Sequence, residues 1–452
     1  MPDMRKNAEH TVTIEGYTST GDGVARIGGQ VVFVKGALRG EKCKIKILKV
    51  LRNIIYAKPV SILTQSPHRQ TPACPNFGKC GGCDLMHMDY NEELDTKRLR
   101  VEDALRRIGG FDIGVPEIIG SDLQEGYRNK AIYAVGEDDG HAVTGFYRER
   151  SHDIIPAEKC HIQANISDRA AFAVRRWMDG CGIPCYDEKS RTGAIRHVFC
   201  RYAFATGKAQ VTIVTADGRL DGLDELIAAI RASCPEMASI VININKTRGN
   251  TVLAGEFRTV WGDDYIEDEL CSLRFKLSPR SFYQINRTQA EKLYAKVLEL
   301  SGLTERDTAL DLYCGTGTIT LLLARRAGRV IGVEIVEAAI ADARENAELN
   351  GIKNAEFICA DAQTAATELK AAGTSPDVVV VDPPRKGLAA DVIDTISDLS
   401  PSRIVYVSCN PATLARDMKL LTQRGYTPGP VTAFDMFPRC AHVETVVLLT
   451  RD

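Results

Sequence analysis

Three side chains stand at the ends of apolar segments, where they could act together. Cys409 closes "RIVYVSCN", Asp382 closes "DVVVVDPP" and Glu444 lies near the start of "HVETVVLLTR". Asn410 and Pro411 follow the cysteine and suit the N-cap and first position of a helix. The partial positive charge of a helix amino end favours a thiolate at Cys409. Core packing is the competing interpretation, since free cysteine is commonly buried.

A thiolate and two carboxyl groups suit methylation of a carbon atom in a pyrimidine. C5 of uracil is a weak nucleophile, but addition of sulfur at C6 turns the ring into an enolate that is nucleophilic at C5. A base must then remove the C5 proton before sulfur can leave. We predict Cys409 as nucleophile and Glu444 as base. We expect Asp382 to hydrogen-bond the uracil edge. Because the thiol of Cys409 has a chemical role in this reaction, we reject core packing as the explanation of its position.

A cofactor site is predicted by "DLYCGTGTITL", which places Gly315 and Gly317 just past an apolar strand. Glycines there allow a sharp turn and close approach of a ligand to a helix amino end. Thr320 replaces the third glycine of a dinucleotide site, which counts against NAD. Glu334 ends the next strand, 19 residues after Gly315, where an acid would bind ribose hydroxyls. Asp361 ends the third strand, near an expected adenine edge, so S-adenosylmethionine fits better than NAD.

The elements that must position these residues begin at about residue 307. Five apolar strands, each followed by a helical stretch, alternate up to "RIVYVSCN", and "HVETVVLLTR" is a further strand. This alternation predicts an α/β domain with a parallel, doubly wound sheet. Ligands gather at the carboxyl ends of such strands, where all the residues above are found.

Two further domains are expected ahead of the catalytic one. Residues 1–66 read as short strands separated by turns and predict an oligonucleotide-binding barrel of five strands. Residues 1–70 carry 12 Lys/Arg against 5 Asp/Glu, and "EKCKIKILKV" predicts a strand with one basic face. Residues 67–268 form a mixed α+β domain that carries a cysteine cluster, and 269–452 the catalytic domain. A helix at about 91–110 is expected to pack on the catalytic domain.

The cysteine cluster has the spacing of a metal site. Cys74, Cys80 and Cys83 are spaced C-x5-C-x2-C, and Cys160 supplies a fourth thiol. Four thiolates can hold zinc or an iron–sulfur cluster, and the spacing does not distinguish the two. His161 is a competing ligand. The remaining thiols are treated as packing or left without a role: Cys181 and Cys185 are expected in the core, and Cys440 is not assigned.

Composition limits the class of protein. The chain has 452 residues, a net charge of −2 and 14 cysteines. No stretch of about 18 uninterrupted apolar residues is present, so we expect no membrane span. The beginning of the chain lacks the apolar core of an export signal, so we expect a reducing cytoplasm.

Together these motifs resemble the RNA uracil-5-methyltransferase family. The resemblance covers nearly the whole chain: a TRAM-like barrel, the cysteine cluster, "SFYQIN", "DLYCGTGTITL", "DPPRKG", "SCNP" and "HVET". It implies a Rossmann-like class I methyltransferase domain in which Cys409 is the nucleophile and Glu444 the base. The cofactor pocket implied is lined by Gln284, Tyr313, Glu334 and Asp382. These join Gly315, Gly317 and Asp361 from the motifs above, and Thr318 is a further candidate. Thr318 stands where some members carry Asn.

The resemblance also implies cofactors and a substrate. The ribosomal branch of the family favours a [4Fe-4S] cluster over zinc at the four cysteines, with a structural or RNA-contacting role. It favours 23S rRNA as substrate and needs no obligate protein partner. A tRNA T-loop uracil-5-methyltransferase is the alternative, and a non-catalytic RNA-binding assembly factor is a third interpretation. Four basic residues accompany tyrosines in "GYRNKA" and "GFYRERS", and either RNA contacts or solvated hairpin faces would explain them: Arg128, Lys130, Arg148 and Arg150.

Overall fold

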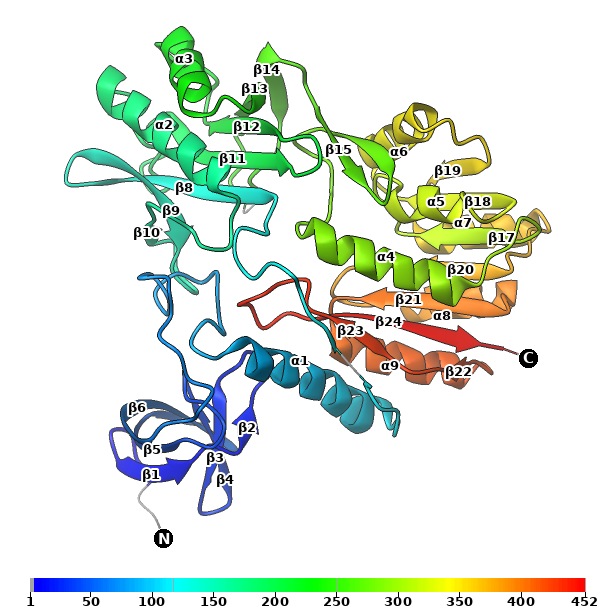
Figure 1. The fold of residues 1–452 in the computed structure, drawn as a ribbon, viewed down its shortest axis with the longest axis horizontal. Coiled ribbons are helices and arrows are strands. Elements are labelled where there is room, and N and C mark those ends of the chain that lie inside the picture. Colours follow the sequence, from blue (N-terminus) through cyan, green and yellow to red (C-terminus); the bar gives the residue numbers. More distant parts are fainter. Residues whose placement is uncertain (1–3, 117, 250, 452) are drawn as a thin grey trace.

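The computed structural model describes residues 4–116, 118–249 and 251–451 and has three lobes (Figure 1). The amino-terminal lobe is one sheet of six strands, where five were expected, in the order β1-β5-β6-β4-β3-β2. Cys43, Ile45 and Ile47 are buried along β5 while Lys42 and Lys44 are exposed, which confirms the basic strand face. The strands are β1 (Glu9–Thr13), β2 (Gly16–Tyr17), β3 (Gly23–Ile27), β4 (Gln30–Val34), β5 (Lys42–Val50) and β6 (Ile54–Thr64).

The middle lobe is a seven-stranded sheet with two helices on one face (Figure 1). Its strand order is β10-β9-β8-β11-β12-β13-β14, and β12 and β13 are the parallel pair. The helices are α2 (Asn165–Cys181) and α3 (Leu223–Ser233). The strands are β8 (Lys130–Asp138), β9 (His141–Tyr147), β10 (Ile154–Pro156), β11 (Ile195–Ala203), β12 (Lys208–Thr215), β13 (Met237–Ile244) and β14 (Glu256–Gly262).

The carboxyl-terminal lobe contains the predicted doubly wound sheet. Five parallel strands run in the order β19-β18-β17-β20-β21, and antiparallel β24 follows β21. The strands are β17 (Thr308–Leu312), β18 (Arg329–Glu334), β19 (Ala355–Cys359), β20 (Val378–Val381), β21 (Arg403–Ser408), β22 (Thr427–Pro428), β23 (Thr432–Phe434) and β24 (Glu444–Thr450). The helices are α4 (Arg287–Ser301), α5 (Thr318–Leu323), α6 (Glu337–Leu349), α7 (Ala362–Ala371), α8 (Ala390–Leu399) and α9 (Pro411–Thr422). A hairpin of β15 (Ile266–Leu270) and β16 (Leu273–Leu277) precedes them.

Two earlier segments complete this lobe. Strand β7 (Ile118–Ile119) pairs in parallel with β23 at the edge of the sheet. Helix α1 (Tyr90–Ala104) continues as a π-helical turn (Leu105–Gly109), and Val101 and Leu105 share one apolar core with the sheet. The helix expected at 91–110 therefore packs on the catalytic lobe.

A buried ion network holds α1 against the loop that leads into β24, residues 435–443. Lys97 Nζ donates to Glu93 Oε1 at 2.7 Å and to Asp435 Oδ1 at 2.6 Å, and all three side chains are at most 1% exposed. Tyr90 Oη donates to the other Asp435 oxygen at 2.8 Å. Removing one partner of such a buried set costs about 3–5 kcal/mol, because the remaining charges lose their compensation. The network therefore fixes the β23–β24 loop on the helix.

Candidate functional site

The three predicted reaction residues meet where β20 and β21 end and the antiparallel β24 begins. Ser408 of β21 is paired with Thr445 of β24, which places the next residue, Cys409, beside Glu444. Asp382 follows β20, the parallel neighbour of β21. Glu444 is 5% exposed, whereas Cys409 and Asp382 are partly buried.

Burial sets the protonation of this group. Burial and then the charge on Asp382 raise the pKa of Glu444 well above its usual range. Burial raises the pKa of Asp382 to about 7. Burial, followed by the charges of Glu444 and Asp382, raises the pKa of Cys409 to about 11, against the opposing charge of Arg385.

Burial and the two acids thus oppose the thiolate that the helix amino end favours at Cys409. The predicted cap itself is present: Asn410 Oδ1 accepts from the amide of Ala412 at 3.2 Å, and Pro411 begins α9. A partial helix charge favours the thiolate, but desolvation and two nearby acids act against it and outweigh it. In the free protein the cysteine is a neutral thiol.

Two residues that sequence reasoning missed border this group. Arg385, in "DPPRKG", is held by Asn410, whose Nδ2 donates to its carbonyl at 3.0 Å. Its guanidinium lies 3.1 Å from His442 Nε2. Burial, then the positive charges of Arg385 and Arg100, lower the pKa of His442 to about 4, so this imidazole is neutral. The position of Arg385 three residues after Asp382 was the available signal.

The predicted cofactor residues gather at the ends of β17 and β18. Glu334 accepts from the amide of Gly315 at 3.2 Å and from that of Val336 at 3.0 Å. Tyr313, Gly315 and Gly317 have left-handed backbones, with φ of 69°, 55° and 83°. A Cβ added at Gly315 would meet no atom within 4 Å, so the loop opens onto free space that a ligand can occupy.

Exposed apolar side chains flank this loop and were missed from the sequence. Phe282, Ile335 and Val336 are 62%, 67% and 53% exposed. The carbonyl of Phe282 accepts from Thr316 Oγ1 at 3.3 Å, which places this segment against the glycine loop. An acid for ribose hydroxyls beside apolar surface for a flat base fits a nucleoside cofactor.

The other predicted cofactor residues occupy this edge with distinct partners. Thr318 Oγ1 lies 3.4 Å from the hydroxyl of Tyr294. Gln284 is partly buried, and its carbonyl accepts from Asn129 Nδ2 at 2.8 Å. Asp361 is exposed and caps α7, accepting from Thr364 N at 3.0 Å and Thr364 Oγ1 at 2.6 Å. Its carboxylate therefore has a structural role independent of any adenine.

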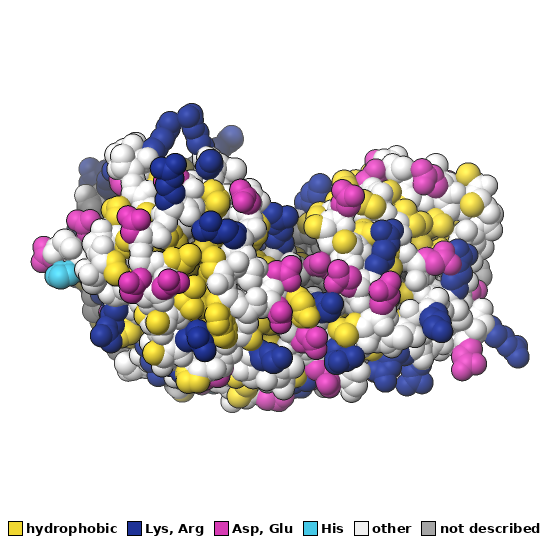
Figure 2. Space-filling view, turned by 90° about the horizontal axis from the view of Figure 1, so that it is seen from above, with side chains coloured by type: hydrophobic (Ala, Val, Ile, Leu, Met, Phe, Trp, Pro, Cys, Tyr) yellow, Lys and Arg dark blue, Asp and Glu magenta, His cyan; other side chains and the backbone are white. Residues whose placement is uncertain are grey.

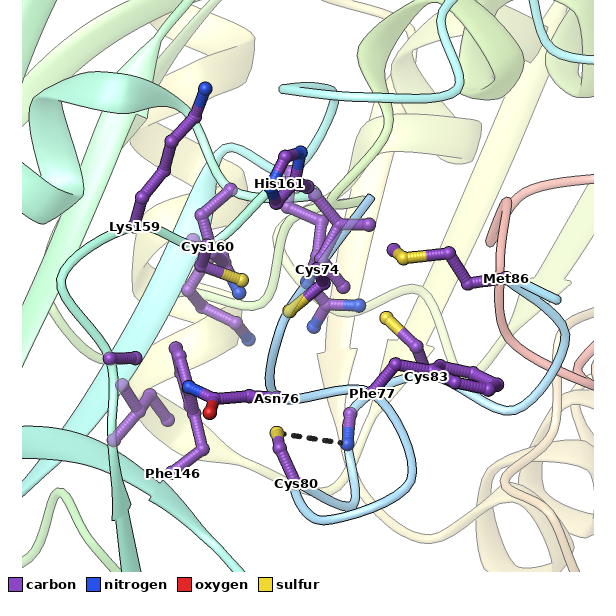
Figure 3. Close-up of a pocket in the computed structure, with 17 residues that line it drawn as sticks. Cys74, Asn76, Phe77, Cys80, Cys83, Met86, Phe146, Lys159, Cys160 and His161 are labelled. Carbon is purple, nitrogen blue, oxygen red and sulfur yellow. Dashed lines mark hydrogen bonds between the residues drawn. The ribbon is translucent and has the colours of Figure 1, made fainter. Parts of the chain in front are cut away.

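The four predicted cluster cysteines line one cavity of about 240 Å³ between the cysteine loop (residues 74–85) and the central sheet. Figure 3 shows their sulfur atoms around one open space, with the amide of Gly82 donating to Cys80 Sγ at 3.3 Å. His161 lines the same cavity, together with three basic side chains: Arg128, Lys130 and Lys159.

This donor set fits a thiolate-bound cluster, because cations stabilise the negative charge of four thiolates. Within the described ranges, however, no group of three or more His, Cys, Asp or Glu side chains is close enough to hold a metal ion. Of the other thiols, Cys185 is partly buried and donates to the carbonyl of Gly136 at 3.0 Å. Cys181 is exposed at the end of α2, so its predicted core position is wrong; the helix ends there and turns it to solvent.

A family model described as tRNA (uracil-5-)-methyltransferase matches residues 251–452, and a TRAM domain model matches residues 5–60. A Bacillus cereus protein described as an uncharacterized RNA methyltransferase is 42% identical over 451 residues, covering 100% of this chain and 98% of that one. The chain belongs to the tRNA (uracil-5-)-methyltransferase family. An uncharacterized RNA methyltransferase of Caldanaerobacter subterraneus is 41% identical over 451 residues, with 100% of both chains covered.

A solved member gives the class I methyltransferase fold of this family. The tRNA (uracil-54, C5)-methyltransferase of Pyrococcus abyssi, in complex with S-adenosyl-L-homocysteine, matches with a TM-score of 0.79. It is 29% identical, and the match covers 99% of each chain. The model of the uracil-5-methyltransferase family covers Glu334, Cys409 and Glu444 but not the cysteine loop.

In this chain, hydrogen bonds tie the cysteine loop to the β23–β24 loop. The carbonyl of Arg439 accepts from the amides of Asp84 and Leu85, each at 2.9 Å. Asp84 Oδ2 accepts from the amide of Ala441 at 2.9 Å. Cys440, which had no predicted role, donates its thiol to the carbonyl of Gly82 at 3.0 Å. Hydrogen bonds thus connect the loop that forms one wall of the cysteine cavity to the segment that leads into Glu444.

Within the described residues, no helix is both long and apolar enough to cross a bilayer.

Proposed function

We propose that this protein is an S-adenosylmethionine-dependent RNA uracil-5-methyltransferase with Cys409 as nucleophile and Glu444 as base. The observation that carries the proposal is the convergence of Cys409, Asp382 and Glu444 at one end of the sheet. A pure RNA-binding factor has no need of a thiol placed between two acids, which argues against the non-catalytic alternative.

The protonation of the three groups fits each chemical step. Cys409 Sγ bonds to C6 of uracil and its proton passes to Asp382, while the C5–C6 electron pair moves into an enolate. Protonated Asp382 then donates a hydrogen bond to the enolate oxygen. When bound, S-adenosylmethionine would supply the methyl group to C5 and leave as S-adenosylhomocysteine.

Product release needs the second acid. Glu444, whose raised pKa favours the protonated acid, must first release its own proton to solvent. As a carboxylate it then removes the C5 proton, the electron pair restores the C5–C6 double bond, and the S–C6 bond breaks. Sulfur leaves as a thiolate that regains its proton from Asp382, and Glu444 is left protonated. A raised pKa makes Glu444 a stronger base than an ordinary carboxylate.

The cofactor is proposed to bind across the glycine loop. Glu334 would bind the ribose hydroxyls, and Phe282 and Ile335 would contact the adenine. Tyr313, Gly315, Gly317 and Asp382 would complete the pocket. Gln284, Thr318 and Asp361 are proposed at its rim.

We propose 23S rRNA as the substrate, with tRNA as the second candidate. The barrel and the cysteine segment favoured rRNA, on the expectation that tRNA enzymes of this type lack both. One observation favours tRNA: the structural match to a tRNA (uracil-54, C5)-methyltransferase covers 99% of this chain and 99% of that enzyme. Seen from above, the molecule is hollowed between its middle and carboxyl-terminal lobes, with Lys and Arg side chains on both sides of the hollow and Asp and Glu side chains beside them (Figure 2). The Lys and Arg side chains there could contact the phosphates of a folded RNA of either kind.

We also propose that Cys74, Cys80, Cys83 and Cys160 hold a [4Fe-4S] cluster. A zinc ion bound by the same four cysteines is the alternative. The shared cavity and its basic lining support this. A brown protein absorbing near about 400 nm, with bound iron and sulfide, is the expected result. A colourless protein that contains zinc would contradict the cluster. The free thiols suit a reducing cytoplasm, where we place the enzyme.

The decisive experiment is tritium release from RNA labelled at C5 of uridine, with S-adenosylmethionine and either 23S rRNA or tRNA. Release from 23S rRNA alone, abolished in Cys409→Ala, is the expected result. Release from tRNA alone would establish the second candidate. Absence of release from both, with folded and cluster-loaded protein, would overturn the proposed reaction.

A further inference from the structure

The central sheet carries an unusual polar face. Along β8, Ala131, Tyr133 and Val135 pack into the core beneath α2 and α3. The alternate residues, such as Ala134, face the other way, and the strand pairing places His197 of β11 beside Ala134. An antiparallel sheet usually exposes its second face to water, yet His197 is 7% exposed. This second face is therefore enclosed but not apolar.

A second cavity, of about 540 Å³, lies on this face. His197 and Arg196 line it from β11, and Tyr147 from the end of β9. The other polar and aromatic side chains of its lining are Phe146, His152, Glu188, Asn245, Arg248 and Thr251. The cavity is larger than the cysteine cavity, and none of the residues assigned to the reaction or to the cofactor lines it.

Two buried nitrogen atoms in this cavity lack partners. His197 Nδ1 and Arg196 Nε are buried without a hydrogen bond, and Arg196 is 6% exposed. The other guanidinium nitrogens of Arg196 are engaged: Nη1 donates to the carbonyl of Asn245 at 2.8 Å, and Nη2 to Glu188 Oε1 at 2.8 Å. An unpartnered buried polar atom costs free energy, and both of these atoms belong to residues that line the cavity.

The aromatic groups define the shape of that ligand. Tyr147 is 36% exposed and lies edge-to-face with His197 and His152, at centroid distances of 6.3 and 5.5 Å. Its hydroxyl is 3.3 Å from His197 Nε2, which leaves Nδ1 free for another group. Burial and the charge on Arg196 lower the pKa of His197 to about 4, so the ring is neutral. A neutral imidazole beside an accessible tyrosine ring suits a flat, uncharged heterocycle rather than a phosphate.

The cavity is a neighbour of the basic cavity of the cysteines. Ile132 and Phe146 line both. Arg128 and Lys130 line the cysteine side, where they can meet a phosphate backbone. Arg248 is exposed at the far rim. A single strand of RNA crossing this wall would have cations for its phosphates and an aromatic pocket for one base.

We propose that the cavity lined by Tyr147, Arg196 and His197 binds the base of an unpaired nucleotide of the substrate RNA. The target uracil itself goes to Cys409, so the pocket holds a different nucleotide of the same RNA. This inference rests on the proposed function, since it takes the methylated RNA as its ligand.

The test uses full-length protein and transcripts of 23S rRNA and tRNA. Tyr147→Ala removes the stacking ring, and Tyr147→Phe keeps it. Phe172→Ala is the matched control, because Phe172 is an aromatic residue of α2, on the opposite face, and is 42% exposed. Loss of one stacked base weakens RNA binding by roughly 5- to 100-fold. We expect that loss in Tyr147→Ala, as a raised KM for RNA at unchanged kcat and unchanged KM for S-adenosylmethionine. Tyr147→Phe and Phe172→Ala should match the unsubstituted protein.

Binding measured without turnover separates this proposal from the proposed function. Fluorescence anisotropy with labelled transcripts, in the absence of S-adenosylmethionine, should show the same weakening even if no methyl transfer occurs. Ultraviolet crosslinking of the unsubstituted protein should attach nucleotides to peptides containing Tyr147 or His197. Equal RNA affinity in Tyr147→Ala and Phe172→Ala, or crosslinks that avoid these peptides, would overturn the proposal.

Discussion

Two halves of one sheet edge use the same residue types for opposite purposes. At the cofactor half, Asp361 is exposed and its pKa is lowered by hydrogen bonds from Thr364. At the reaction half, Glu444 is buried and its pKa is raised by burial and by Asp382. A carboxylate at a strand end is therefore a fixed negative charge in one half and a proton carrier in the other. Burial and neighbouring charge, rather than residue type, make the difference.

Glu444→Gln should have the largest effect. It should abolish the function of the reaction half of the sheet edge and leave the cofactor half unchanged. Without a base the C5 proton stays, so Cys409 cannot leave and turnover should fall by about 10²- to 10⁴-fold. A covalent enzyme–RNA adduct should accumulate, visible as a slow band in a denaturing gel. The double variant Cys409→Ala/Glu444→Gln should form no adduct. Normal turnover in Glu444→Gln would assign the base to another residue.

Glu334→Ala tests the cofactor half. It removes the acceptor for Gly315 and Val336 as well as the proposed ribose contact. The KM for S-adenosylmethionine should rise by about 10- to 100-fold, as expected for hydrogen bonds to a charged group. The KM for RNA should not change. Glu337→Ala, an exposed acid at the start of α6, is the matched control. Equal effects of the two substitutions would contradict the ribose role.

Asp382→Asn tests, through the free energy of unfolding, whether a carboxyl group of the reaction half is held in its protonated form. Because burial raises the Asp382 pKa to about 7, above its ordinary 3.8, the folded state binds a proton more tightly than the unfolded chain. The free energy of unfolding of the unsubstituted protein should therefore fall as pH rises from about 4 to 7. At pH 8 the Asn variant should be more stable by about 2 kcal/mol, after allowance for partial exposure.

Urea unfolding of both proteins at several pH values measures this difference. The gap should shrink as pH falls below 7 and close near the ordinary pKa of an aspartate. A gap that stays constant with pH would show that the amide acts by packing rather than by removing a charge.

Asp361→Asn should have the smallest effect. Asparagine is as good an N-cap as aspartate, so stability should change by less than about 0.5 kcal/mol, whereas Asp361→Ala should cost about 1 kcal/mol. The KM for S-adenosylmethionine should stay within about 3-fold for Asn. Thermal unfolding and initial rates measure both. A tenfold rise in that KM would make Asp361 a direct cofactor ligand and narrow the contrast between the two halves.

Local patterns made much of this architecture predictable. Some segments have a conformation that their own residues determine, and each forms as expected: the apolar run before Cys409, the glycines after Leu312 and the Asn410–Pro411 cap. The Lys-rich alternation of β5 is equally local. The reaction residues could be grouped because strand ends in a doubly wound sheet share one edge.

Features that depend on distant contacts could not be predicted in this way. The raised pKa of Cys409 arises from Glu444, 35 residues later, and from burial by the whole lobe. The hydrogen bond of Cys440 to Gly82 joins segments far apart in the chain. The enclosed polar face around His197 follows from strand pairing and from the loop that contains Asn245. No short motif carries that information.

The edge strand β7 has a consequence for how the chain can be divided. Ile118 and Ile119 extend the methyltransferase sheet, and α1 covers its core with Val101 and Leu105, so this folding unit is discontinuous in sequence. A fragment that starts at residue 269 would leave β23 unpaired along one side and an apolar surface open to water. Such an edge is a template for aggregation. Helix α1 and strand β7 are thus not detachable: the catalytic unit is closed only when these two earlier segments have been added to it.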